Sequence, residues 1–80
     1  MTHSEVLVEL QAVFVQVFND DEVKVEDGTT ANDIEDWDSL AHLQLISVIE
    51  KKFYIHFSLG EINSFSNVGE MCDCIVKHLK

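Results

Sequence analysis

The stretch Asp36-Trp37-Asp38-Ser39-Leu40 decides how this chain is organised, because it places a serine hydroxyl at the head of an amphipathic helix. Two carboxylates come before this serine and a leucine follows it. Either Asp38 or Ser39 is a suitable N-cap, since a side-chain oxygen there accepts a hydrogen bond from a free helix amide. Nothing next to Ser39 activates its hydroxyl, which is typical of a residue that is modified rather than one that attacks.

The helix that follows Ser39 is predicted to span residues 40–53. At about 100° of rotation per residue, its core face gathers Ala41, His42, Leu45, Ile46, Ile49 and Phe53. The opposite side carries Leu40, Gln44, Ser47 and Lys51, with Leu43 and Glu50 flanking it. Single exposed leucines are ordinary on protein surfaces. Two of them beside Ser39 form a candidate docking patch.

The rest of the chain is also predicted to be helical. A first helix is expected over roughly residues 4–18, capped by Thr2 with Glu5 or by Ser4, with the stripe Val6, Leu7, Leu10, Val13, Phe14, Val17 and Phe18. A last helix begins after Ser66-Asn67 and carries the stripe Val68, Met71, Cys72, Ile75, Val76 and Leu79. Residues 58–62 are expected to form one short helical turn. A chain of 80 residues fits one domain.

A long connection over about residues 19–38 joins the first two long helices. Loops beyond roughly 12–15 residues are uncommon in compact domains and are usually functional or disordered. Most of the acids lie here, namely Asp20, Asp21, Glu22, Glu26, Asp27, Asp33, Glu35, Asp36 and Asp38. Val23, Val25, Ile34 and Trp37 are placed to pin the loop to the core. Two interpretations stay open, an anionic approach to Ser39 and a solvated charge run.

The charge of the chain excludes several classes of partner. Fifteen acids against five basic residues give a net charge of −10. Nucleic acid and anionic membrane surfaces would repel this protein, whereas enzymes with basic patches would attract it. No apolar run approaches the ~18 residues of a membrane span, and no secretory signal is visible. A cytoplasmic monomer is expected, without a disulfide between Cys72 and Cys74, whose side chains point to different helix faces.

Metal binding and catalysis are not predicted from these residues. With Gly28 as the sixth residue of a calcium loop, only Asp27 occupies a ligand position. Cys74 and His78 are four residues apart on one helix, but two ligands do not make a metal site. Nucleophilic catalysis by Ser39 would require a base and an oxyanion hole. His42 is the nearest base, but it leans toward the core, so no enzyme activity is expected.

The residues around Ser39 resemble those of the acyl carrier proteins. Asp38-Ser39-Leu40 is similar to the Asp-Ser-Leu attachment motif of that family. The following helix matches the family pattern through Leu43, Leu45, Ile49, Glu50 and Phe53, and Asn67-Val68 is similar to the start of the family's last helix. The resemblance covers nearly the whole chain. It implies an all-α, acyl-carrier-like four-helix bundle over residues 1–80, with three main helices, one short helix and a long first loop.

The resemblance also implies a function. Ser39 would receive phosphopantetheine from coenzyme A through a separate, magnesium-dependent phosphopantetheinyl transferase, with Asp38 and Leu40 as motif neighbours. The thiol of the arm would hold acyl groups as thioesters, delivered and removed by acyl-loading and acyl-transferring enzymes with basic patches. The expected partner-binding residues are Asp36, Asp38, Leu40, Leu43, Gln44 and Glu50.

Departures from the family pattern indicate a specialised pathway, whether linked to fatty acids, polyketides or saccharides. Ala41 and Gln44 stand where fatty-acid-synthesis carriers often have acids, and Lys51 and Lys52 add positive charge. Trp37-Asp38 replaces the glycines that often precede the serine in peptidyl carriers. The alternative function is an unmodified acidic helical module for protein interaction.

Overall fold

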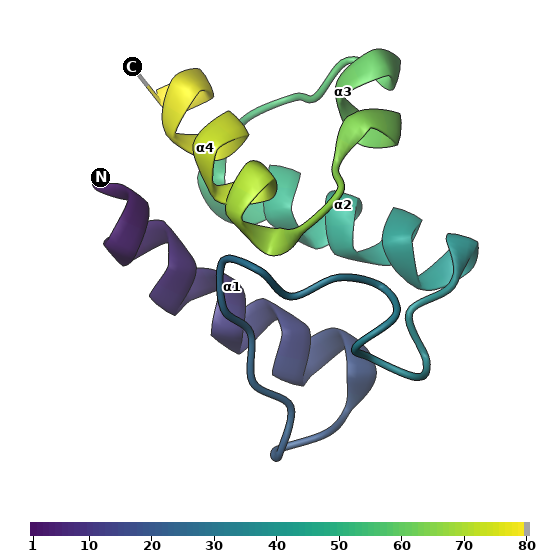
Figure 1. The fold of residues 1–80 in the computed structure, drawn as a ribbon. Coiled ribbons are helices and arrows are strands. Elements are labelled where there is room, and N and C mark those ends of the chain that lie inside the picture. Colours follow the sequence, from purple (N-terminus) through teal and green to yellow (C-terminus); the bar gives the residue numbers. More distant parts are fainter. Residues whose placement is uncertain (80) are drawn as a thin grey trace.

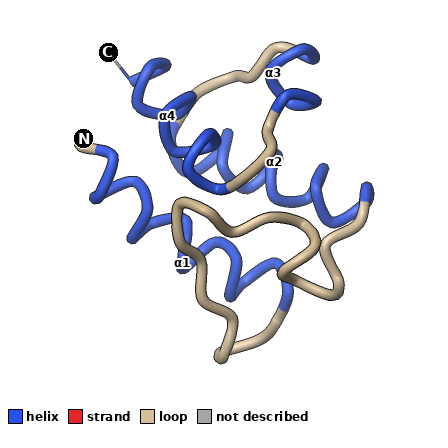
Figure 2. Tube along the Cα trace, viewed as in Figure 1, coloured by secondary structure: helices blue, strands red, loops and turns tan. Residues whose placement is uncertain are grey.

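The protein folds as a bundle of four helices. The computed structural model describes residues 1–79, which form α1 (His3–Phe18), α2 (Ser39–Phe53), α3 (Leu59–Ser64) and α4 (Val68–Leu79), with no strand among them. Helix α1 packs against both α2 and α4, and the short α3 lies beside α4, on the side of the molecule away from α1 (Figure 1). Figure 2 shows the long first loop beside α1. The predicted fold class is confirmed.

The helix ends follow the local capping chemistry. Thr2, not Ser4, caps α1, because its hydroxyl accepts a hydrogen bond from the Glu5 amide at 3.2 Å while the Glu5 carboxylate accepts one from the Thr2 amide at 2.8 Å. Ser58 and Glu61 form the same capping box on α3. This box begins α3 at Leu59 and the helix runs on to Ser64, two residues beyond the predicted turn.

The long loop is held in place by side chains and by backbone hydrogen bonds. The Gln11 side chain donates to the Val23 carbonyl at 2.6 Å and accepts from the Val25 amide at 2.9 Å. Val25 is buried, and Val23, Ile34 and Trp37 pack against the core, as predicted. Carbonyls of the loop also cap α4, since the Gly69 amide donates to the Asp27 oxygen at 2.8 Å. The backbone of the loop is therefore anchored to the helices, while its nine acidic residues are exposed.

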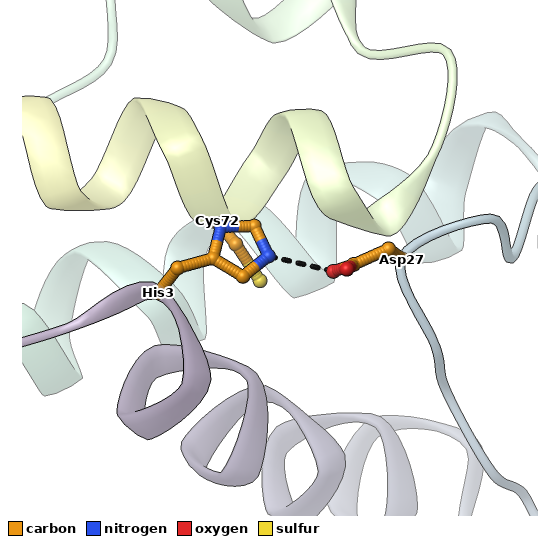
Figure 3. Close-up of side chains that lie close together, drawn as sticks. All are labelled: His3, Asp27 and Cys72. Atoms are coloured by element: carbon orange, nitrogen blue, oxygen red, sulfur yellow. Dashed lines mark hydrogen bonds and ion pairs between the residues drawn. The ribbon is translucent and has the colours of Figure 1, made fainter.

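His3 fastens the loop to both terminal helices. Its Nε2 donates to Asp27 Oδ1 at 2.6 Å, and its Nδ1 donates to Asp73 Oδ1 at 2.8 Å. Both partners are carboxylates, so the two hydrogen bonds form together only when the ring is protonated on both nitrogens, and they raise the pKa of His3 above its usual value. Figure 3 shows the imidazole aimed at Asp27, with Cys72 next to it. The sequence gives no sign of this three-way contact.

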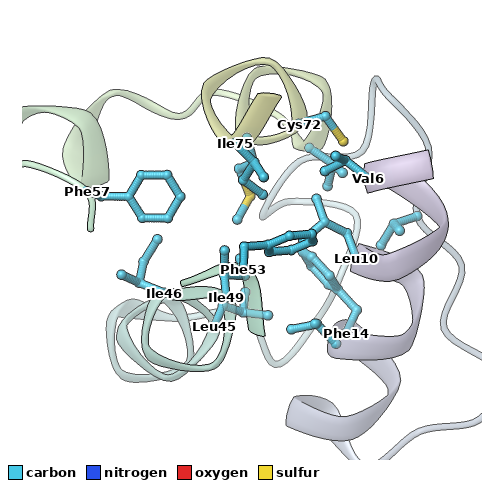
Figure 4. Close-up of a cluster of buried hydrophobic side chains, with 14 of the residues drawn as sticks. Val6, Leu10, Phe14, Leu45, Ile46, Ile49, Phe53, Phe57, Cys72 and Ile75 are labelled. Atoms are coloured by element: carbon cyan, nitrogen blue, oxygen red, sulfur yellow. The ribbon is translucent and has the colours of Figure 1, made fainter. Parts of the chain in front are cut away.

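The core lies between the apolar faces of α1, α2 and α4 (Figure 4). Its fully enclosed side chains are Val6, Leu10, Val13, Phe14, Leu45, Ile49, Val68, Met71, Cys72 and Ile75. The predicted stripes are confirmed, although Leu7, Val17, Phe18, Val76 and Leu79 are only partly buried. His42 departs from its predicted core position, because it is half-buried and both of its ring nitrogens form hydrogen bonds.

Candidate functional site

Ser39 is the first residue of α2, and its neighbour Asp38 caps the helix. The Asp38 carboxylate accepts a hydrogen bond from the Ala41 amide at 2.8 Å. The choice between Asp38 and Ser39 as N-cap is thereby decided, and the Ser39 hydroxyl is not needed for capping. Asp38, Ser39 and Leu40 are all exposed. The structure thus presents the serine oxygen at the surface, at the positive end of the helix dipole.

An open cleft of about 530 Å³ lies beside Ser39. This volume falls within the range of sites that hold small molecules. The cleft is formed by the end of the long loop, the first turn of α2 and the region of α3, and its lining residues are Ala31, Trp37, Asp38, Ser39, His42, Leu43, Ile62, Asn63, Phe65 and Ser66. A group attached to Ser39 can therefore lie against a partly apolar wall.

His42 ties the three parts of this cleft together. The indole nitrogen of Trp37 donates to His42 Nδ1 at 3.2 Å. Because Nδ1 accepts, the ring proton lies on Nε2, which donates to the Ile62 carbonyl of α3 at 2.9 Å. His42 has no free nitrogen with which to act as a base toward Ser39. Its function in this fold is to fix the positions of the loop, α2 and α3 relative to one another.

The predicted partner-binding residues fall into two groups. Leu40 and Leu43 are 66% and 58% exposed, and Asp36, Asp38 and Gln44 are exposed beside them. The Glu50 side chain is only 21% exposed, and its carboxylate accepts a hydrogen bond from the Phe57 amide at 2.8 Å. Glu50 therefore stabilises the turn after α2, whereas the other five residues are exposed, and two of them, Asp38 and Leu43, line the cleft together with Ser39.

The residues of the far wall of the cleft were not among those predicted from the sequence. Ile62, Asn63, Phe65 and Ser66 come from α3 and the segment after it, more than twenty residues beyond Ser39. Phe65 was the available signal, as an aromatic residue three positions after the predicted turn at residues 58–62, but its position against α2 depends on the packing of α3. Among residues 1–79, no helix is both long enough and apolar enough to cross a membrane.

Comparisons with known proteins agree with this geometry. Residues 8–75 match the family model described as a phosphopantetheine attachment site. The solution NMR structure of a holo acyl carrier protein from Geobacter metallireducens is 44% identical to this chain, with a TM-score of 0.87 over 91% of this chain and 84% of that one. No curated protein matches.

The matches define a carrier domain with a phosphopantetheine attachment site. This chain belongs to the acyl carrier protein family, whose prosthetic group is a covalently attached phosphopantetheine. The residues present fit that group. An exposed alcohol at the start of a helix is available for a phosphodiester bond, and the adjoining cleft has room for part of the arm.

Proposed function

We propose that this protein carries acyl groups on a phosphopantetheine arm attached to the Ser39 oxygen. The observation that supports this most strongly is the position of Ser39, which is exposed at the first position of α2 while Asp38 performs the capping. When attached, the arm supplies a terminal thiol that holds the cargo as a thioester.

The first turn of α2 favours the attached phosphate. The aligned peptide dipoles give the start of a helix a partial positive charge, which stabilises an anion there by roughly 0.3–1 kcal/mol. Asp38 opposes this effect because its carboxylate is adjacent, but it accepts a hydrogen bond from the Ala41 amide and so faces along the helix. Ser39 holds the linkage at the surface, where the arm can reach other enzymes.

The cleft beside Ser39 is proposed to shelter the arm or a short cargo. Trp37 and Phe65 supply aromatic surface, and the hydrogen bonds of His42 keep the two walls at a fixed separation. A preorganised wall lowers the entropy that is lost on binding. Cargo that rests in this cleft would be partly shielded from water between transfer steps.

Partner enzymes are proposed to dock on the surface formed by Asp36, Asp38, Leu40, Leu43 and Gln44, which we call the docking surface. The phosphopantetheinyl transferase must approach Ser39 and would contact Leu40 first. The two leucines supply apolar contact area, and the two aspartates attract basic patches. Association should weaken as salt screens these charges. Glu50 is left out of this surface because the fold already uses its carboxylate.

The chain is proposed to serve one specialised biosynthetic pathway, with fatty acid, polyketide or saccharide-linked cargo. Ala41 is buried in the first turn of α2 and Gln44 is neutral, so this part of the docking surface lacks two acids common in fatty-acid-synthesis carriers. Lys51 adds an exposed positive charge, whereas Lys52 pairs with Glu9 at 3.1 Å. We further propose that the carrier is a cytoplasmic monomer and performs no catalysis itself.

One experiment tests the proposed attachment. The purified chain is incubated with coenzyme A, magnesium and a broad-specificity phosphopantetheinyl transferase, and its intact mass is measured. The expected result is the mass of one added phosphopantetheine, absent in Ser39→Ala and retained in Ser47→Ala, which changes an exposed serine of the same helix. If a positive-control carrier is modified and this chain is not, the proposal is wrong and the unmodified interaction module is favoured.

A further inference from the structure

Among residues 1–79, two clusters of metal-ligating side chains lie outside the cleft, and their chemistry differs. One cluster is His3, Asp27 and Cys72 (Figure 3), and the other is Glu61, Cys74 and His78. The first is unsuitable for a metal ion, because both nitrogens of His3 donate to carboxylates and Cys72 is fully buried. To bind a metal ion, a histidine needs a ring nitrogen without a proton, and a cysteine must be a thiolate that the ion can reach.

The second cluster brings three potential metal ligands together from two helices. Cys74 and His78 lie one turn apart on the same face of α4, the spacing with which a helix offers two ligands to one ion. Glu61 reaches them from α3, with its Oε2 at 3.3 Å from Cys74 Sγ and at 3.0 Å from His78 Nε2. The ligand atoms all lie within 4.8 Å of one another.

Glu61 is held in position before any ion arrives. Its Oε1 accepts a hydrogen bond from the Ser58 amide at 2.8 Å as part of the α3 capping box. These hydrogen bonds, together with those from His78 and Cys74, lower the pKa of Glu61 to about 2, so the carboxylate is ionised. The Glu61 and His78 side chains are 27% and 28% exposed, which leaves the cluster open to an ion from solvent.

We propose that Glu61, Cys74 and His78 bind one Zn²⁺ ion, with water as the fourth ligand. A thiolate, an imidazole and a carboxylate are a donor set that zinc prefers, whereas Mg²⁺ and Ca²⁺ take oxygen ligands. Zinc bonds of about 2.0–2.3 Å place tetrahedral ligand atoms roughly 3.4–3.6 Å apart. The observed separations of 3.0 and 3.3 Å therefore need to widen by only a few tenths of an ångström.

Binding would release the thiol proton of Cys74 to solvent as the sulfur–zinc bond forms. His78 Nε2 donates a proton to Glu61, so this nitrogen must also give up its proton to bind the ion, and the neutral ring then carries its one proton on Nδ1. Burial and the nearby Glu61 carboxylate raise the pKa of Cys74 to about 11, so the ion must compete with that proton. Zinc affinity should therefore fall as the pH falls.

The ion would clamp α3 to the C-terminal half of α4. Helix α3 has six residues and no fully buried side chain, although Ile62 packs against the core and its carbonyl accepts a hydrogen bond from His42. Because α3 also supplies Ile62 and Asn63 to the cleft beside Ser39, zinc would stiffen one wall of that cleft. This inference does not depend on the modification of Ser39.

The test is a titration of the full-length, reduced, unmodified chain with Zn²⁺, followed by calorimetry and by thermal unfolding. We expect one ion per chain and a higher Tm. Cys74→Ser and His78→Gln should each weaken Zn²⁺ binding at least about tenfold. Loss of a residue that only hydrogen-bonds to a metal ligand already lowers metal affinity by about tenfold or more, and these two residues bind the ion directly. The controls His3→Gln and His56→Gln should bind as the parent does, because His3 belongs to the other cluster and His56 is almost fully exposed.

The Ser39→Ala background separates this result from the attachment chemistry, since no arm thiol can bind zinc there. Circular dichroism of each variant without metal checks that it is folded. Substitution of Co²⁺ gives a second measurement, a thiolate-to-metal absorption band that Cys74→Ser should abolish. Failure of the folded parent to bind Zn²⁺, or binding that survives Cys74→Ser, overturns the proposal. Binding that His3→Gln removes also overturns it and assigns the ion to the other cluster.

Discussion

The indole of Trp37 donates a hydrogen bond to the imidazole of His42 at 3.2 Å, and the two rings stack with centroids 6.0 Å apart. Trp37 comes from the long loop and also packs edge-on against Phe14 of α1, with ring centroids 5.2 Å apart. His42 belongs to α2 and reaches α3 through the Ile62 carbonyl. This pair therefore connects the core with both walls of the cleft beside Ser39.

Trp37→Phe should lower the free energy of unfolding, because His42 Nδ1 loses its donor while most of the aromatic packing remains. A hydrogen bond of this kind contributes about 0.5–1.5 kcal/mol. Chemical denaturation of Trp37→Phe, His42→Phe and the double variant measures the coupling between the two side chains. The double variant should be less destabilised than the sum of the single ones. Strict additivity would show that the contact contributes nothing.

Leu40→Glu should slow modification by the phosphopantetheinyl transferase without unfolding the protein. Leu40 is 66% exposed at the centre of the docking surface, so the substitution removes apolar contact area and leaves the core intact. Val8→Glu is the matched control, since Val8 is 71% exposed on α1, away from Ser39. Thermal unfolding first checks that both variants keep the Tm of the parent. The initial rate of modification of each variant is then compared with that of the parent. Equal rates for both variants would remove Leu40 from the docking surface.

Gly69→Ala should destabilise the fold, because an added Cβ would lie 2.9 Å from the backbone oxygen of Asp27. Overpacking of this kind typically costs about 1–3 kcal/mol. Gly60→Ala is the matched control in α3, where the nearest atom is 4.0 Å away, and the better helix propensity of alanine should stabilise it by up to about 1 kcal/mol. Urea denaturation measures both. A stable Gly69→Ala variant would mean that the loop does not press on α4.

The contact of His3 with Asp27 and Asp73 should make stability depend on pH. These carboxylates raise the pKa of His3 above 6.5, so its stabilising effect is complete below pH 6.5 and is lost as the pH rises through the raised value. The pairs are exposed, which limits the effect to at most about 1 kcal/mol. Denaturation curves of the parent and His3→Gln should differ at acidic pH and converge at alkaline pH. A constant difference would contradict this assignment.

Local patterns in the sequence predict the parts of the fold that depend on neighbouring residues. The spacing of Val6, Leu10 and Phe14 gives the first helix and its buried face, and Asp38 with Ser39 gives the start of the second. The end of α3 at Ser64 was missed, because the short helix lacks a buried stripe that would mark its length.

Contacts between distant segments could not be predicted in this way. The position of Phe65 opposite Ser39, and of Glu61 beside Cys74 and His78, depends on how α3 packs against α2 and α4. The periodicity of one helix contains no information on such pairings. His42 shows the same limit, since it was predicted on the core face but is half-buried, and its two hydrogen bonds were not predicted.

Fragmentation of the modified chain in a mass spectrometer identifies the residue that carries the phosphopantetheine. After incubation with the transferase and coenzyme A, the added phosphopantetheine should be found only on fragments that contain Ser39. Cleavage of the phosphodiester bond to Ser39 should remove the phosphopantetheine mass from those fragments. Added mass on any other residue, or an unmodified chain beside a fully modified control carrier, would contradict the account.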